Sequence, residues 1–206
     1  MRVRSLVASV LLVAFVALPA SPAAAAVPRC FGQPATHVMH PSDPEYDGTA
    51  GDDVVVGTAG HDVIGLSNLG GTDLACGGGG YDQIGVAGPS SKADGGAARD
   101  EVVAFDGAFA RGGSGNDGVS AAGAGGRAEG GSGGDFVVAN RGATGDGGSG
   151  DDEVVGLEGA ALYGGSGSDL VRNLTSFPAT KLDCGSAFDR YLPNGATDVR
   201  RCEQLV

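Results

Sequence analysis

The stretch GGSGGDFVV, residues Gly130–Val138, holds four glycines, one aspartate and a closing pair of valines. Glycine loses more conformational freedom on folding than other residues, and it is favoured where the backbone needs a positive φ or close packing. The first six residues therefore predict a tight turn. The apolar residues that follow predict a short strand. Asp135 stands where the turn meets the strand, so the question is what this turn holds.

The same nonapeptide recurs along the chain in the form G-G-x-G-x-D-x-U-x, where U is aliphatic. Eight near-copies begin at Gly48, Gly57, Gly77, Gly95, Gly112, Gly130, Gly147 and Gly164. Self-similarity at a fixed period is typical of solenoid proteins. Two nonapeptides make one coil of about 18 residues, which predicts an all-β fold, a parallel β-roll (β-solenoid) with disulfide-bearing end caps.

These nonapeptides resemble the calcium-binding repeats of hemolysin-type (RTX) proteins, over roughly Gly48–Arg190. The resemblance implies a β-roll in which the six-residue turns bind Ca²⁺ and the U side chain of each short strand points inward. The flanking segments CFGQPATHV, which begins at Cys30, and LDCGSAFDRYL through CEQLV, which includes Cys184 and Cys202, also resemble the caps of secreted actinobacterial calcium-binding proteins of this type.

Coils of this length stack alternate half-turns on one edge of the roll. One edge then carries an aspartate at every level: Asp62, Asp82, Asp100, Asp117, Asp135, Asp152, Asp169 and Asp189. The opposite edge carries Asp53 and Asp73, followed by Ser91, Ala108, Gly126, Ala143, Ala160 and Thr180. Because the inward positions stay filled by small or aliphatic residues on both sheets, we expect one calcium-binding edge and one largely metal-free edge.

Stacked coils lie about 4.8 Å apart, so neighbouring carboxylates repel one another unless a cation lies between them. Ca²⁺ accepts six to eight oxygens in flexible geometry, whereas Mg²⁺ demands a tight octahedron. The predicted cofactor is Ca²⁺. The predicted ligands are Asp62, Asp82, Asp100, Asp117, Asp135, Asp152, Asp169, Asp53 and Asp73, with backbone oxygens at Gly77, Gly112, Gly130, Gly147 and Gly164. The simpler alternative is a metal-free solenoid with solvated turn aspartates.

The beginning of the chain predicts a secretory signal peptide over residues 1–26. Arg2 and Arg4 precede an apolar run from Leu6 to Leu18, and small residues that allow A-x-A cleavage follow. The run is short for a membrane span, and no second one follows, so we expect a secreted, extracellular protein. The remaining chain divides into an N-terminal cap (27–47), the repeats (48–176) and a C-terminal cap (177–206).

Four cysteines remain after this cleavage: Cys30, Cys76, Cys184 and Cys202. An even number in a secreted chain favours disulfides, and the spacings match no C-x-x-C metal pattern. Three pairings are possible. A role as end clamps favours Cys30 with Cys76 and Cys184 with Cys202. Solenoid ends expose core, and we expect Phe188 and Tyr191 to help cover the C-terminal end.

Charge and composition limit the partners. Without Arg2 and Arg4, 11 basic residues face 25 acidic ones, a formal charge of −14. Such a surface repels nucleic acid and anionic membranes and attracts cations, and we expect a monomer that does not insert into membranes.

Catalysis is not predicted. The chain has no Trp and shows no H-E-x-x-H motif. Two roles remain open: a calcium-dependent structural or adhesive module, or a targeting or accessory module for an extracellular partner such as cell wall or glycan.

Overall fold

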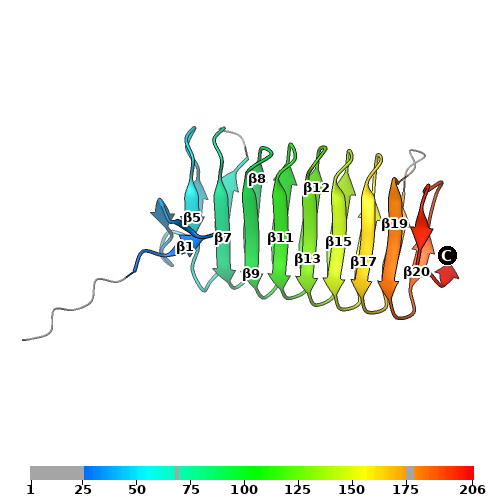
Figure 1. Cartoon of the computed structure of the whole chain (residues 1–206). Helices are drawn as coiled ribbons and strands as arrows, with labels where there is room; N and C mark the ends of the chain where they lie inside the picture. The colour runs from blue at the N-terminus through cyan, green and yellow to red at the C-terminus, as the bar shows by residue number, and fades with distance from the viewer. Residues whose placement is uncertain (1–25, 68–69, 175–178) are drawn as a thin grey trace, which may run out of the picture.

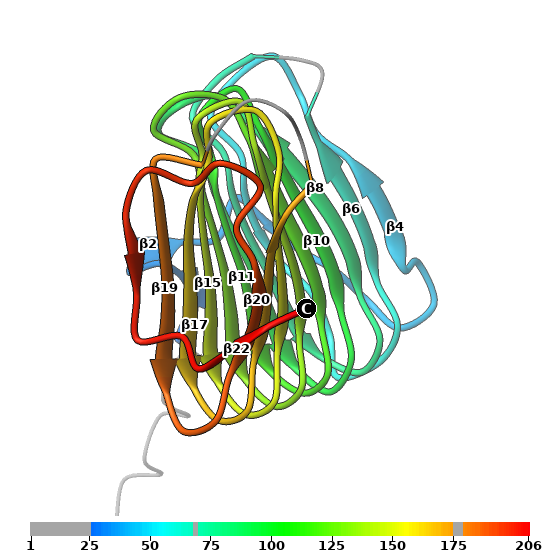
Figure 2. The same ribbon diagram turned by 90° about the vertical axis from the view of Figure 1, so that its right-hand side faces the viewer.

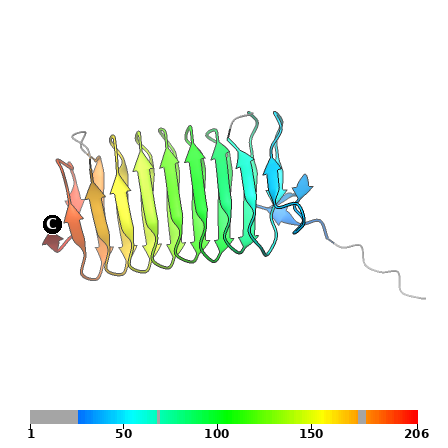
Figure 3. The same ribbon diagram turned by 180° about the vertical axis from the view of Figure 1, so that it is seen from behind.

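The computed structural model describes residues 26–67, 70–174 and 179–206. The chain winds as a parallel β-solenoid, with ten strands in each of two sheets that lie along opposite sides of the array. Figures 1 and 2 show this arrangement, and Figure 3 shows the same array from behind. The predicted fold class is therefore confirmed. The predicted signal peptide lies outside the described residues, except for Ala26.

We call the first sheet the odd sheet. Its strands, in spatial order, are β3 (His37–Val38), β5 (Val54–Val56), β7 (Leu74–Gly79), β9 (Lys92–Ala97), β11 (Phe109–Ser114), β13 (Arg127–Ser132), β15 (Thr144–Ser149), β17 (Ala161–Ser166), β19 (Lys181–Ser186) and β21 (Val199–Arg200). A separate antiparallel pair, β1 (Arg29–Cys30) and β2 (Gln33–Pro34), precedes it.

The even sheet carries the alternate half-turns. Its strands are β4 (Glu45–Asp47), β6 (Val63–Leu66), β8 (Gln83–Ala87), β10 (Glu101–Phe105), β12 (Gly118–Ala122), β14 (Phe136–Asn140), β16 (Glu153–Gly156), β18 (Leu170–Asn173), β20 (Arg190–Leu192) and β22 (Gln204–Leu205). Both sheets thus extend into the two predicted cap segments, 27–47 and 177–206.

The strand register follows from the aliphatic U positions. Val119 of β12 pairs with Val102 of β10 on one side and Val137 of β14 on the other. On the odd sheet, Ala110 of β11 pairs with Ala128 of β13 in the same way. A shift by one residue would turn every inward side chain outward, so the alternation specifies the register strongly. The prediction that small or aliphatic residues fill the inward positions of both sheets is confirmed.

The core between the sheets is narrow and tightly packed. Its inward positions are mostly Val, Ala, Ile and Leu, and most of these side chains are completely buried. Gly145 occupies one inward position of β15, where an added Cβ would lie 3.2 Å from the Cβ of Ala139 and 3.4 Å from methyl groups of Val137 and Val154. The small residues therefore set the separation of the two sheets.

Disulfides tie both ends of the solenoid. Cys30 is bonded to Cys76 and Cys184 to Cys202, with Cα–Cα distances of 5.7 and 5.1 Å, so the favoured pairing is confirmed. Tyr191 is partly buried and packs against the core, as expected. The expectation for Phe188 was wrong, because this side chain is 59% exposed. It occupies the outward-facing turn position directly before Asp189.

Candidate metal site along one edge

The turns that run from each odd-sheet strand to the next even-sheet strand end in an aspartate. Asp117, for example, directly precedes β12, and Asp135 directly precedes β14. Parallel pairing in register therefore places one aspartate at each level. We call this set the aspartate column: Asp62, Asp82, Asp100, Asp117, Asp135, Asp152, Asp169 and Asp189.

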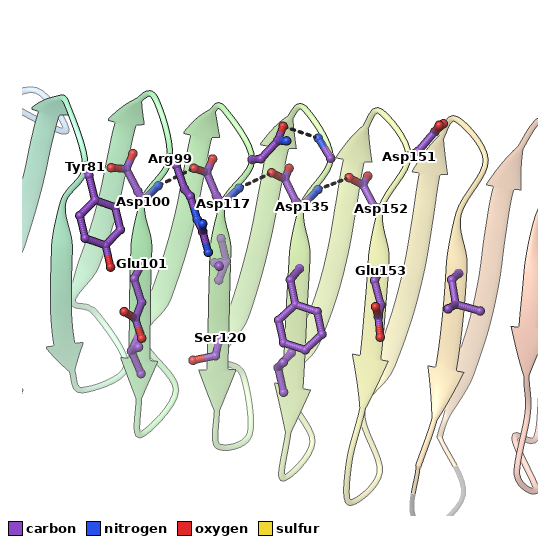
Figure 4. Close-up of a pocket in the computed structure, with 18 residues that line it drawn as sticks. Tyr81, Arg99, Asp100, Glu101, Asp117, Ser120, Asp135, Asp151, Asp152 and Glu153 are labelled. Atoms are coloured by element: carbon purple, nitrogen blue, oxygen red, sulfur yellow. Dashed lines mark hydrogen bonds between the residues drawn. The ribbon is translucent and has the colours of Figure 1, made fainter.

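One carboxylate oxygen of each later column member is bonded to the backbone of the preceding member. The N–H of Asp117 donates to Oδ1 of Asp135, and the N–H of Asp135 donates to Oδ1 of Asp152, both at 2.8 Å. Figure 4 shows these bonds as dashed lines. The same bond joins every neighbouring pair from Asp62 to Asp189 at 2.8 to 3.0 Å. The column carboxylates are thereby held in one repeated orientation.

The second carboxylate oxygen is buried and lacks a donor in most of the column. Among the described residues, no hydrogen-bond partner reaches Oδ2 of Asp82, Asp100, Asp117, Asp135, Asp152, Asp169 and Asp189. These side chains are at most 3% exposed, and the ion pairs within the described part of the chain include none of them. A buried acceptor without a partner costs about 1 to 3 kcal/mol, and more when it is charged.

The unpartnered oxygens face the first glycine of their own turn. An ideal Cβ on Gly130 would lie 2.4 Å from Oδ2 of Asp135 and 2.4 Å from the carbonyl oxygen of Gly147 in the next coil. Corresponding contacts recur at the other predicted glycines, Gly77, Gly112, Gly147 and Gly164, and at Gly95. At each level a carboxylate oxygen and a carbonyl oxygen therefore flank one space that only glycine leaves open.

The first two glycine-rich turns satisfy their carboxylates internally. Thr58 donates to Oδ2 of Asp62 through its N–H at 2.6 Å and its hydroxyl at 2.9 Å. Thr49 donates to Oδ2 of Asp53 in the same way, at 2.6 and 3.1 Å. Later turns have glycine at this position, such as Gly131 with φ of 117°. Oδ2 of Asp53 and of Asp62 therefore has donors within its own turn, unlike Oδ2 of the column members from Asp82 to Asp189.

The two ends of the column differ from its middle. Pro44 lies one level before Asp62, since its carbonyl accepts the N–H of Val63 at 2.7 Å. Proline has no N–H, and Oδ1 of Asp62 is accordingly buried without a donor among the described residues. At the other end, the N–H of Asp189 donates to Oε2 of Glu203 at 2.9 Å. Sequence reasoning missed Glu203, although Glu203-Gln204-Leu205 repeats the D-x-U pattern with glutamate in place of aspartate.

Asp53 and Asp73 lie on the opposite edge, which we call the second edge. The N–H of Asp53 donates to Oδ1 of Asp73 at 3.0 Å, and the N–H of Asp73 donates to the hydroxyl of Ser91 at 2.9 Å. The next level holds Ala108, because the N–H of Phe109 donates to the carbonyl of Ser91 at 3.0 Å. The side-chain ladder on this edge therefore ends after three residues.

Burial changes the protonation of the column. It raises the pKa to about 7 for Asp82 and Asp152 and to about 6 for Asp100, Asp117 and Asp169. The N–H bond to Oδ1 opposes the rise in each case, and neighbouring column charges add to it for Asp82 and Asp152. The structure thus disfavours the ionised carboxylates unless positive charge is supplied.

The donor set fits a hard cation. It consists of carboxylate and carbonyl oxygens, and seven buried Oδ2 atoms lack any partner among the described residues. The carboxylates are distributed singly over successive levels. In the part of the chain that the structure describes, no group of three or more His, Cys, Asp or Glu side chains is gathered at one point. A cation here would draw on neighbouring coils and on backbone oxygens.

A shallow trough lies on the outer face of the even sheet, beside the column. It has a volume of about 870 Å³, and its lining includes Tyr81, Glu101, Gly118, Phe136 and Glu153. Gly118 contributes no side chain, and an ideal Cβ there would meet only the carbonyl oxygen of Asp100, at 3.8 Å. Figure 4 shows Glu101 and Glu153 on this face below the column.

Comparison of the chain with models of known protein families, with curated proteins and with solved structures found no match. The described segments contain no helix long and apolar enough to cross a membrane. The functional argument therefore rests on the geometry of the column.

Proposed function

We propose that this protein is a secreted calcium-binding β-solenoid, in which the aspartate column holds Ca²⁺ between successive coils. The observation that carries the proposal is the row of seven buried Oδ2 atoms without a donor or counter-ion among the described residues. Such a row is costly in a metal-free protein and useful in a cation-binding one. Among the residues that the structure describes, the second edge shows no comparable row.

Calcium matches the available donors better than other common cations do. Each level offers a carboxylate oxygen beside a backbone carbonyl oxygen, as Asp135 Oδ2 and Gly147 O show. Ca²⁺ is bound by mixed carboxylate and carbonyl oxygens in flexible geometry, whereas Mg²⁺ retains water and zinc prefers nitrogen and sulfur. When bound, the ion would supply the positive charge that the buried carboxylates lack. The chain itself supplies their alignment, through the N–H bonds to Oδ1.

The repeat pattern supports the same proposal. The nonapeptides G-G-x-G-x-D-x-U-x resemble RTX repeats, and we infer that the protein shares their use of calcium as a structural ligand. Export is supported by the apolar segment that begins the chain and by the two disulfides, which are typical of oxidising compartments. Mass spectrometry of the mature N-terminus would test the predicted cleavage near Ala26.

The test of calcium binding is a count of bound ions. Native mass spectrometry of the mature protein in excess Ca²⁺ should show about six to eight ions, roughly one per interval of the column. Asp135→Asn should lose one or two of them, because the amide keeps the shape but not the charge. Asp106→Asn, at an exposed turn residue outside the column, is the matched control and should lose none. A wild-type protein that binds no Ca²⁺ would falsify the proposal.

The trough supports a second candidate function, the binding of an extracellular glycan. Phe136 lines the trough and is 48% exposed. Glu153 is its partner on the next strand, and Glu101 lies two strands away on the other side, beyond Gly118. An exposed ring with nearby hydrogen-bonding groups suits a sugar, whose face is apolar and whose rim is polar. Phe136→Ala should abolish retention on cell-wall polysaccharide while leaving the ion count unchanged. Equal retention of both proteins would exclude this role for the trough.

A further inference from the structure

The C-terminal end of the column contains a carboxylate that does not come from a glycine-rich turn. Arg190 of β20 pairs with Gln204 of β22, and Tyr191 pairs with Leu205. Glu203 therefore occupies the level after Asp189, as each column aspartate follows the one before it. Its Oε2 accepts the N–H of Asp189 at 2.9 Å, the same bond that aspartates accept elsewhere in the column.

Asp189 presents an unsatisfied oxygen at this end. Its side chain is completely buried, and its Oδ2 has no hydrogen-bond partner among the described residues. In the middle of the column, the space beside such an oxygen is bounded by the next coil. After Asp189 the next coil is the short segment that carries Glu203. The side chain of Glu203 is exposed, so its carboxylate can be reached from solvent.

Two contacts beside Glu203 position its backbone. Cys202 is bonded to Cys184, with a Cα–Cα distance of 5.1 Å. Arg201 donates from Nε to Oδ1 of Asp183 at 2.7 Å. Elsewhere a glycine-rich turn performs this task, but the residues before Glu203 read DVRRC and contain no glycine. A covalent bond and an ion pair therefore replace the turn at the last level.

We propose that Glu203 is the terminal ligand of the column and that, with Oδ2 of Asp189, it holds one further Ca²⁺ at the C-terminal end. This inference rests on the proposed function, because it adds one more site to the same row. The new site lies at the level after Asp189 and uses a glutamate in place of an aspartate. Glu203 directly precedes β22, a strand of two residues at the open end of the even sheet.

The decisive experiment compares Glu203→Gln with Glu45→Gln. The amide in Glu203→Gln can still accept the N–H of Asp189 but carries no charge. Glu45 lies exposed on β4, at the opposite end of the same sheet, so its variant has the same change in charge. Native mass spectrometry in excess Ca²⁺ should show one ion fewer for Glu203→Gln and the wild-type number for Glu45→Gln, with equal β-sheet circular dichroism.

The outcomes separate the two proposals. If wild type binds no Ca²⁺, the proposed function itself fails. If wild type binds Ca²⁺ and Glu203→Gln binds the same number, only the terminal site is overturned.

A second measurement on wild type covers the case in which Glu203→Gln does not fold. Carbodiimide labelling of the calcium-loaded protein should modify Glu45 and spare Glu203, although both side chains are exposed. Equal labelling of the two residues would contradict the site.

Discussion

The two edges of the solenoid share the same strands and the same core, yet they complete their turns differently. On the second edge, the four turns from Gly88 to Ala143 are closed by backbone hydrogen bonds: for example, the N–H of Ala108 donates to the carbonyl of Phe105 at 3.1 Å, and that of Gly126 to the carbonyl of Gly123 at 3.0 Å. On the aspartate edge, the seven turns from Asp82 to Asp189 each bury a carboxylate whose Oδ2 has no donor among the described residues. The described turns of the second edge thus satisfy their polar groups within the chain, whereas we propose that a cation satisfies those of the aspartate edge.

The largest expected effect is that of calcium removal. Chelation of the mature protein at pH 7.5 should strip most of its β-sheet signal in far-ultraviolet circular dichroism. The physical reason is that seven buried carboxylate oxygens lose their only source of positive charge, while the narrow core offers little compensation. Spectra that are identical with and without Ca²⁺ would show that the aspartate edge is as self-sufficient as the second edge.

Acidification should partly replace calcium. Burial raises the pKa of Asp82 and Asp152 to about 7 and that of Asp100 to about 6, well above the usual value for aspartate. These carboxyl groups therefore bind more protons in the folded chain than in the unfolded chain between about pH 4 and 7, so their contribution to stability is fully present below about pH 4 and is lost as pH rises through this window.

The measurement is circular dichroism of the metal-free protein at pH 4.5 and 7.5. We expect more β-sheet at pH 4.5, and a higher Ca²⁺ concentration at half-saturation at pH 5.5 than at 7.5, because protons compete for the same oxygens. A metal-free protein that gains β-sheet as pH rises would contradict the burial of these carboxylates in the folded state.

Replacing a turn glycine by alanine should destabilise the aspartate edge more than the second edge. In Gly130→Ala the new Cβ would lie 2.4 Å from both Asp135 Oδ2 and the Gly147 carbonyl, so we expect a loss of about 2 to 4 kcal/mol in unfolding free energy. Gly125→Ala on the second edge meets no atom within 4 Å and suffers only the strain of a φ of 84°, about 1 kcal/mol. Urea unfolding in saturating Ca²⁺ measures both, and equal losses would deny the special crowding at Gly130.

The smallest effect is expected in the turn where a threonine donates a hydrogen bond to the aspartate of the same turn. Thr58→Ala removes the hydroxyl that donates to Oδ2 of Asp62, and should reduce stability by about 1 kcal/mol without changing the number of bound ions. Thr72→Ala, at an exposed threonine of the second edge, is the control and should change stability little. A loss of one ion in Thr58→Ala would mean that Asp62 is a ligand that depends on this hydroxyl.

The sequence predicted much of this architecture because the repeat carries its own register. The alternation of aliphatic positions determines which residues stack, and hence the aspartate column, both inward rows and the second edge. The pattern could not show that Oδ1 of a column carboxylate accepts a hydrogen bond while Oδ2 has no donor, because this depends on the position of the N–H in the preceding coil. It also gave no reason to separate Thr58 from the glycines at the same repeat position.

The ends of the chain were harder to predict than the middle. Glu203 was missed because no glycine-rich turn precedes it, and its alignment comes instead from the bonded Cys202. Phe188 was expected to cover the core, but it occupies the turn position that faces solvent. Phe188 thus follows the repeat, at the variable position before Asp189, whereas Glu203 departs from the repeat and tertiary contacts decide its place.

The uniform bond between one column aspartate and the next gives the molecule a modular length. Neighbouring levels from Asp82 to Asp169 are separated by 17 or 18 residues, and each level is bonded only to those beside it. Excision of residues 118–135 would join Asp117 to Phe136, bring β10 beside β14, and shorten the array by about 4.8 Å. The middle of this protein therefore consists of equivalent coils. Gene duplication or protein engineering can add or remove one coil at a time and so change the length of the array.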